Sequence, residues 1–220
     1  MMFTMACTQA PDSDKAETSE AQAVTETAPG ETWAMDPTVS KVEWIGTKVS
    51  GYHLGALPIK SGGLQVQSGT ITGGKFVMDL SGLTVTGPKG SDKAGNDKLT
   101  GHLKSPDFFD VANYPEATFE VTAVTPFTGE QVAEQEDPRQ ADINKYMVDT
   151  PTHTISGNLT IKNITKNIQF PARIMVMDDT VNAMAKFNID RSQWDLKYTG
   201  KPDDLIRKEI HLGILLKATK

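Results

Sequence analysis

The chain has 220 residues, of which 38% are hydrophobic, enough for one sizeable core in a single domain. Its formal net charge of -6 and its lack of clustered Lys and Arg exclude a nucleic-acid-binding protein, because phosphate contacts require such clusters. The single cysteine, Cys7, excludes an intramolecular disulfide framework and a Cys-rich zinc site.

Residues 1–32 are predicted to lie outside the folded domain, which we place at 33–220. They begin with a short apolar run that ends in Ala6-Cys7 and continue with a Ser-, Thr-, Ala- and Glu-rich segment that has too few large apolar groups to order itself. This pattern resembles the end of a bacterial lipoprotein signal, but truncated, since a secretory signal needs about 7 to 15 apolar residues. We expect a lipidated Cys7, a lipid anchor in the membrane and a disordered tether; an ordinary frayed terminus with an incidental Cys is the alternative.

Period-two alternation of apolar and polar residues recurs from Trp33 onwards, with turn residues between the alternating segments. About eight strands are predicted, and no long amphipathic helix. They lie at residues 39–49, 64–67, 75–80, 117–123, 155–161, 168–176, 181–189 and 206–216. The pattern favours an all-β fold, an up-and-down antiparallel barrel that leaves no exposed edge.

Two long connections interrupt the alternation. Residues 87–110 are rich in turn formers and are expected to hold short helical turns, with Ser105-Pro106-Asp107 as a helix start. Residues 128–151 are acidic and lie between two strands, which favours a solvated hairpin insertion.

The sequence contains none of the common catalytic signatures, such as G-x-S-x-G, H-E-x-x-H or a complete phosphate-binding loop. The four histidines, His53, His102, His153 and His211, are far apart and include no i, i+4 pair. We therefore predict no catalytic residue, no metal site and no cofactor other than a bound ligand.

Four segments together resemble one family. They are "KVEWIGTKVSGYHLGALPIKSGGLQVQSGTITGGKFVMDL", "LTGHLKSPDFFDVANYPEATFEV", "GNLTIKNITKNIQFPARI" and "FNIDRSQWDL", within residues 35–218. The chain is thereby identified as similar to the YceI-like family of polyisoprenoid-binding, lipocalin-like proteins. The resemblance implies a barrel of about eight strands with an elongated apolar interior. It also implies a long isoprenoid lipid or an isoprenoid quinone as ligand, location in the cell envelope, periplasmic or lipid-anchored, and no catalysis.

A barrel of this size either is filled by its own side chains or leaves room for one ligand. Inward faces of the alternating segments, with two aromatic residues of the 102–121 corner, supply the candidate apolar lining, although each member also suits simple core packing. The candidates are Trp44, Leu64, Val66, Phe76, Met78, Leu80, Phe108, Phe109, Phe119, Val121, Leu159, Ile161, Phe170, Ile174, Phe187, Ile189, Ile210 and Ile214.

Three polar residues near strand ends or turns, Lys48, His53 and Arg191, are candidates for a ligand head group. The alternatives are solvated surface charges, a hydrogen-bonded loop histidine for His53, and a structural stacking pair of Arg191 with Trp194. The leading hypothesis is a non-enzymatic carrier or store of an isoprenoid lipid or quinone. The other is a filled barrel that acts as an interaction module without a lipid. The sequence leaves the oligomeric state open.

Overall fold

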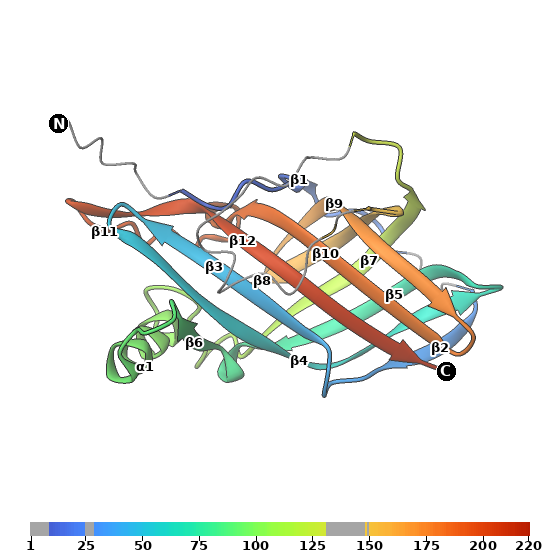
Figure 1. Cartoon of the computed structure of the whole chain (residues 1–220), viewed down its shortest axis with the longest axis horizontal. Helices are drawn as coiled ribbons and strands as arrows, with labels where there is room; N and C mark the ends of the chain where they lie inside the picture. The colour runs from blue at the N-terminus through green and yellow to red at the C-terminus, as the bar shows by residue number, and fades with distance from the viewer. Residues whose placement is uncertain (1–8, 25–28, 131–147, 149) are drawn as a thin grey trace.

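The computed structural model describes residues 9–24, 29–130, 148 and 150–220. Its main element is a closed antiparallel barrel with eight strand positions, as the sequence predicts (Figure 1). The barrel strands are β2 (Glu31–Met35), β3 (Lys41–Lys48), β4 (Gly51–Gln67), β5 (Thr70–Asp79), β7 (Glu116–Pro126), β8 (His153–Ile161), β9 (Ile164–Met177), β10 (Thr180–Asp190) and β12 (Asp204–Thr219). Pairing of β8 with β9 closes the barrel.

β2 and β3 share one position in the barrel, between β4 and β12. Trp33 of β2 pairs with Leu64, while Trp44 of β3 pairs with Gly55 on one side and Leu212 on the other. Between the two strands the chain makes a turn in which the Asp36 backbone N–H donates to the Lys217 carbonyl at 2.8 Å. The two short strands therefore act as one broken strand.

Shorter elements cover the ends and the outside of the barrel. They are β1 (Glu17–Glu20), β6 (Thr84–Gly87), β11 (Gly200–Lys201), the 3-10 turns η1 (Leu80–Gly82) and η2 (Arg191–Trp194), and the helix α1 (Lys93–Lys104). The inward faces of the barrel strands form one hydrophobic core, in which Phe187 and Trp194 are fully buried. Alternation places these apolar side chains inside because successive residues of a strand point to opposite faces.

The long connection before β7 differs from the prediction of short helical turns, because it contains the 12-residue helix α1. Asp92 caps the helix by accepting a hydrogen bond from the Gly95 backbone N–H at 2.9 Å. Gly and Asn lower its intrinsic helix propensity. Packing overrides this cost, since Leu99 and Leu103 border the barrel interior and Thr100 accepts a hydrogen bond from Val85 of β6 at 3.1 Å.

The helix start predicted at Ser105-Pro106-Asp107 is also wrong. Ser105 is instead the C-cap of α1, and both its backbone N–H and its hydroxyl donate to the His102 carbonyl, at 3.1 and 2.7 Å. Ser105 therefore stops the helix. Residues 106–115, which include Phe108 and Phe109, follow as a set of turns that we call the aromatic corner.

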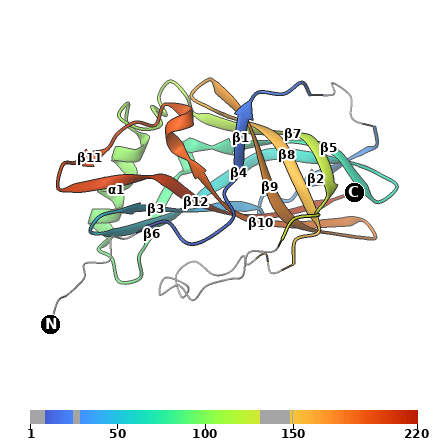
Figure 2. The ribbon, with the colours of Figure 1, turned by 90° about the horizontal axis from the view of Figure 1, so that it is seen from above.

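The tether predicted to be disordered is ordered in part, because β1 pairs antiparallel with β9 (Figure 2). Composition gave no sign of this strand, since all four of its residues are exposed. Its pairing depends on backbone hydrogen bonds, which any sequence can make. Cys7 and most of the 128–151 insertion lie outside the described residues. No helix among the described residues is long and apolar enough to cross a membrane.

Candidate functional site

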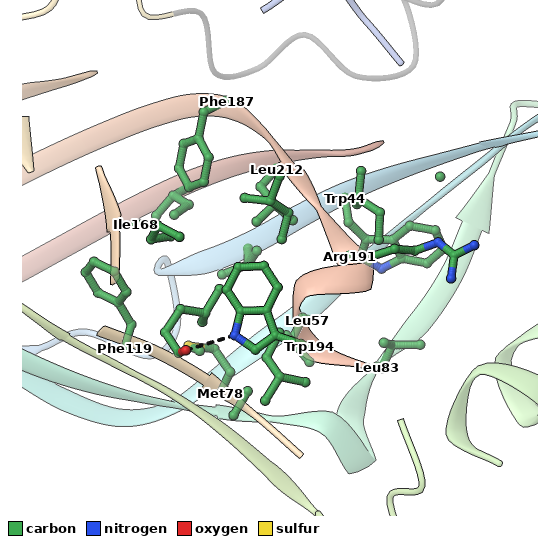
Figure 3. A pocket seen from close by; sticks show the side chains of 18 of the residues that line it. Trp44, Leu57, Met78, Leu83, Phe119, Ile168, Phe187, Arg191, Trp194 and Leu212 are labelled. Carbon is green, nitrogen blue, oxygen red and sulfur yellow. Dashed lines mark hydrogen bonds between the residues drawn. The ribbon is translucent and has the colours of Figure 1, made fainter. Parts of the chain in front are cut away.

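The barrel contains a cavity of about 490 Å³, whose border on β12 runs from Asp204 to Leu216. Every barrel strand except β2 contributes side chains to its wall, and α1, η2 and the aromatic corner contribute at one end. Figure 3 shows apolar side chains such as Met78, Phe119 and Leu212 pointing into this space from different strands. The barrel is therefore hollow.

The candidate apolar lining residues border the cavity, with Val66 as the exception among them. Val66 is buried in the core near the end of β4, where it pairs with Glu31 of β2 and with Ile71 of β5. A register shift between Gln65 and Val66 marks an irregularity at this point. Alternation shows which face of a strand is inward, but it does not show how far the cavity extends along the strand.

Further lining residues were absent from the prediction. Some, such as Ile155, Ile168 and Leu212, continue the alternation of predicted strands and were accessible to the same reasoning. Others had no periodic signal: Leu57 and Ile59 flank Pro58 in the long strand β4, and Trp194 lies in the turn η2. Tertiary structure alone brings these residues to the cavity.

Aromatic rings form part of the cavity wall. Phe170 stacks on Phe187 with ring centroids 4.0 Å apart, and Phe119 packs against Phe170 at 5.8 Å. Trp194 is fully buried, and its indole Nε1–H donates to the Leu159 carbonyl at 2.9 Å (Figure 3). This bond fixes η2 against β8, so that the indole presents its apolar surface to the cavity.

The three polar candidates, Lys48, His53 and Arg191, all border the same end of the cavity. Lys48 forms a 2.6 Å ion pair with Asp204, which also accepts a hydrogen bond from the Ser50 backbone N–H at 3.0 Å. The Lys48 ammonium and the Ser50 N–H together lower the pKa of Asp204 to about 2. This end of the barrel therefore holds a fixed carboxylate beside a paired ammonium.

His53 lies on the inward face of β4, opposite Gly46 of β3. Burial, assisted by the charge of Lys48, lowers the pKa of His53 below its usual value, so the imidazole is neutral at pH 7. Its Nδ1 and the indole Nε1 of Trp44, both buried at this end, have no hydrogen-bond partner among the described residues. The two atoms are therefore polar groups of the cavity wall that a ligand could contact.

Arg191 is buried, and its guanidinium donates hydrogen bonds to three backbone carbonyls. Nε donates to the Arg207 carbonyl at 3.1 Å, Nη2 to the Tyr198 carbonyl at 2.7 Å, and Nη1 to the Leu196 carbonyl. Burial lowers the pKa of Arg191 from its usual value. The side chain predicted to contact a head group is thus already bonded to three backbone carbonyls. These hydrogen bonds fix the segment between η2 and β11.

The aromatic corner borders the cavity at this polar end through Phe108 and Phe109. His102 of α1 meets Tyr198 and Phe108 edge-on, with ring centroids 4.8 and 5.4 Å apart, and its Nε2 lies 3.3 Å from an Asp107 carboxylate oxygen. The corner therefore borders a cavity rather than a solid core. Among the described residues, no group of three or more His, Cys, Asp or Glu side chains is placed to bind a metal ion.

Comparison with known proteins gives a family match and a fold match. A family model described as YceI-like domain matches residues 33–218. The structure of Burkholderia cenocepacia BcnA has a TM-score of 0.58 at 17% identity, over 84% of this chain and 99% of that one. A polyisoprenoid binding domain from Saccharophagus degradans, implicated in plant cell wall breakdown, has a TM-score of 0.57 at 14% identity, over 85% and 97%. No curated protein matches the chain.

Proposed function

The chain belongs to the YceI-like domain family, and from this premise we propose that it binds one long-chain isoprenoid lipid or isoprenoid quinone inside its barrel. The protein acts as a carrier or store in the bacterial cell envelope and performs no catalysis. The family is a binding-domain fold, and a structural neighbour is described as a polyisoprenoid binding domain.

The observation that carries the proposal is the hollow, apolar interior. Each CH₂ group of a ligand that moves from water into such an interior contributes about 0.8 kcal/mol. An isoprenoid tail has many such groups and no polar atom, so it needs no hydrogen bond from the wall. Rings such as Phe170, Phe187 and Trp194 provide continuous contact surface for its methyl branches.

The head group of the ligand lies at the polar end, beside Lys48 and His53. The unused polar atoms of His53 and Trp44 support this orientation, because a buried donor or acceptor without a partner is costly. Arg191 contributes indirectly, by holding the loop around Tyr198. The tail then extends from Trp44 past Trp194 and Phe187 toward the far end of the barrel (Figure 3).

Location in the cell envelope, periplasmic or lipid-anchored, rests on the Ala6-Cys7 pattern and the polar segment that follows it. Labelling with palmitate in the native host, applied to the native protein and to the variant Cys7→Ser, tests whether Cys7 carries a lipid anchor. Label on the native chain and none on the variant supports the anchor, whereas an unlabelled native chain contradicts it.

Two measurements test the binding function. Mass spectrometry of an organic extract of the purified protein should yield a stoichiometric isoprenoid species. In addition, Leu212→Trp should weaken binding of a benzoquinone with a polyisoprenoid tail about tenfold or more, because the added indole occupies the cavity that Leu212 borders. Leu205→Trp, at a residue 45% exposed, is the matched control and should bind normally.

A lipid-free extract together with equal binding by both variants would contradict the proposal. The protein would then act through its outer surface, as an interaction module whose cavity has no ligand.

A further inference from the structure

Two neighbouring barrel strands separate along part of their length. β9 and β10 pair directly from Met177 and Thr180, at their hairpin, to Ala172 and Ala185. Beyond this point, residues 14–20 continue the pairing on both sides: β1 pairs with residues 166–169 of β9, and Asn188 of β10 exchanges backbone hydrogen bonds with Asp14 and Ala16 at 2.7 and 2.9 Å. We call this gap the β9–β10 seam, and residues 10–22 the N-terminal strap.

The seam lies over the cavity. Ile168 and Phe170 of β9 and Phe187 and Ile189 of β10, which flank the seam, all border the cavity. The stacked rings of Phe170 and Phe187 join the two strands on the inside. The strap therefore forms the outer closure of the seam, and the two rings form the inner one.

The strap is attached mainly by polar contacts. Asn158 anchors one end by accepting from the Gln22 N–H at 3.0 Å and donating to the Gln22 carbonyl at 2.7 Å, and Asn188 donates to the Pro11 carbonyl at 2.9 Å. Apolar anchoring among these residues is small, since Ala10 and Pro11 are buried and Ala16 packs against the core, while all of β1 is exposed. Such a segment opens at much lower free energy than a barrel strand.

Two ion pairs add little to this attachment. Glu20 contacts Lys166 at 2.6 Å and Lys15 contacts Glu209 at 2.5 Å, with Glu20 and Lys15 themselves 87% and 74% exposed on their side chains. Exposed pairs of this kind contribute little to stability, because water and salt screen them. Without the strap, β9 keeps its ladder to β8 and β10 its ladder to β12, so the barrel persists.

We propose that the N-terminal strap is a detachable wall of the cavity, and that a lipid tail enters sideways through the β9–β10 seam when the strap leaves. This inference rests on the proposed function. His102, Phe108 and Tyr198 pack against one another where they border the polar end of the cavity, so a tail that entered at this end would have to pass beside them. A side opening also lets an apolar tail pass from a membrane to the cavity without crossing water.

A reversible cross-link tests the strap. Glu17 of β1 and Gln169 of β9 are exposed and lie directly opposite each other. The Cα atoms of such antiparallel pairs are separated by a distance that a disulfide can span. The variant carries Glu17→Cys, Gln169→Cys and Cys7→Ser in the full chain. The control carries Lys75→Cys, Glu120→Cys and Cys7→Ser, which links β5 to β7, a directly paired part of the barrel.

Loading is followed by quenching of tryptophan fluorescence, since Trp44 and Trp194 border the cavity, with vesicles that contain a polyisoprenoid benzoquinone. The oxidised strap variant should load about tenfold or more slowly than its reduced form, whereas the control should load equally in both states. Hydrogen exchange of the Ala16 and Asn188 amides, measured without lipid, should slow on oxidation of the strap variant alone.

Equal loading of the oxidised and reduced strap variant overturns the proposed route and leaves the binding function in place. No loading by either variant in either state contradicts the binding function, and the route with it. Exchange of the Ala16 and Asn188 amides at the rate of the β8–β9 amides contradicts detachment itself.

Discussion

The guanidinium carbon of Arg191 lies 5.8 Å from the centroid of the Phe108 ring. Through this contact the turn η2, which contributes Arg191 and Trp194 to the cavity wall, is joined to the aromatic corner at the polar end. Arg191 also donates to three backbone carbonyls, so one buried side chain holds both structures.

Arg191→Met should destabilise the protein by about 3 kcal/mol, because three backbone carbonyls, one of them on the buried Leu196, lose their donor. Arg191→Lys should recover little of this loss, since an ammonium cannot match the planar fork of the guanidinium. Urea unfolding measures both. Lys201→Met, at an exposed residue of the same cavity end, is the control and should unfold like the native protein; equal stability of all three variants would contradict the role of Arg191.

Gly55→Ala should lower stability by about 3 kcal/mol. A Cβ at this position would lie 1.9 Å from the Thr84 carbonyl oxygen and 2.7 Å from the Trp44 ring, so β6 and the indole would have to move. Gly51→Ala in the same strand meets nothing within 4 Å and should be nearly neutral. Thermal unfolding of the two variants checks the contrast, and a smaller loss for Gly55→Ala than for Gly51→Ala would refute the close packing of Trp44 on β4.

His53 should titrate below its usual value of 6.5, because burial and the charge of Lys48 lower its pKa. The unfolded chain then binds more protons than the folded chain, so His53 removes stability as the pH falls below 6.5. His53→Gln should flatten this part of the stability profile. The pKa itself is measured by NMR of the imidazole, and a midpoint above 6.5 would contradict its burial.

Asp204→Asn should remove a second pH dependence of the free energy of unfolding, at more acidic pH than that of His53. Hydrogen bonds from Lys48 and Ser50 lower the pKa of Asp204 to about 2, so its contribution is fully present above 3.8 and is lost as the pH falls toward 2. Urea unfolding at several pH values in this range checks it. The native protein should lose stability there more steeply than Asp204→Asn, and parallel profiles would count against the Lys48–Asp204 pair.

The barrel could be predicted from the sequence because alternation records one physical fact, the two faces of a strand. The strands at β7, β8, β9, β10 and β12 follow it closely. Residues 51–63 of β4 did not show it, since Pro58, Gly62 and Gly63 interrupt the pattern while the backbone pairing continues. β1 had no apolar signal at all.

The site was predictable in the same uneven way. Inward faces marked most of the apolar wall, whereas Trp194 depends on one hydrogen bond between distant segments. The charge of Arg191 suggested contact with a ligand head group. Its partners are instead backbone carbonyls that only the folded chain brings within reach. Sequence pattern reports burial better than it reports which buried polar groups face one another.

The residues of β12 that border the cavity run from Asp204 to Leu216. At about 3.3 Å per residue this is about 40 Å of strand, or about 30 Å along a barrel with a typical tilt. Affinity should rise with each added prenyl unit until the tail reaches this limit and then level off. Under the proposed function, the length of β12 therefore sets how much of a tail the barrel can cover, and with it the longest tail that still gains affinity.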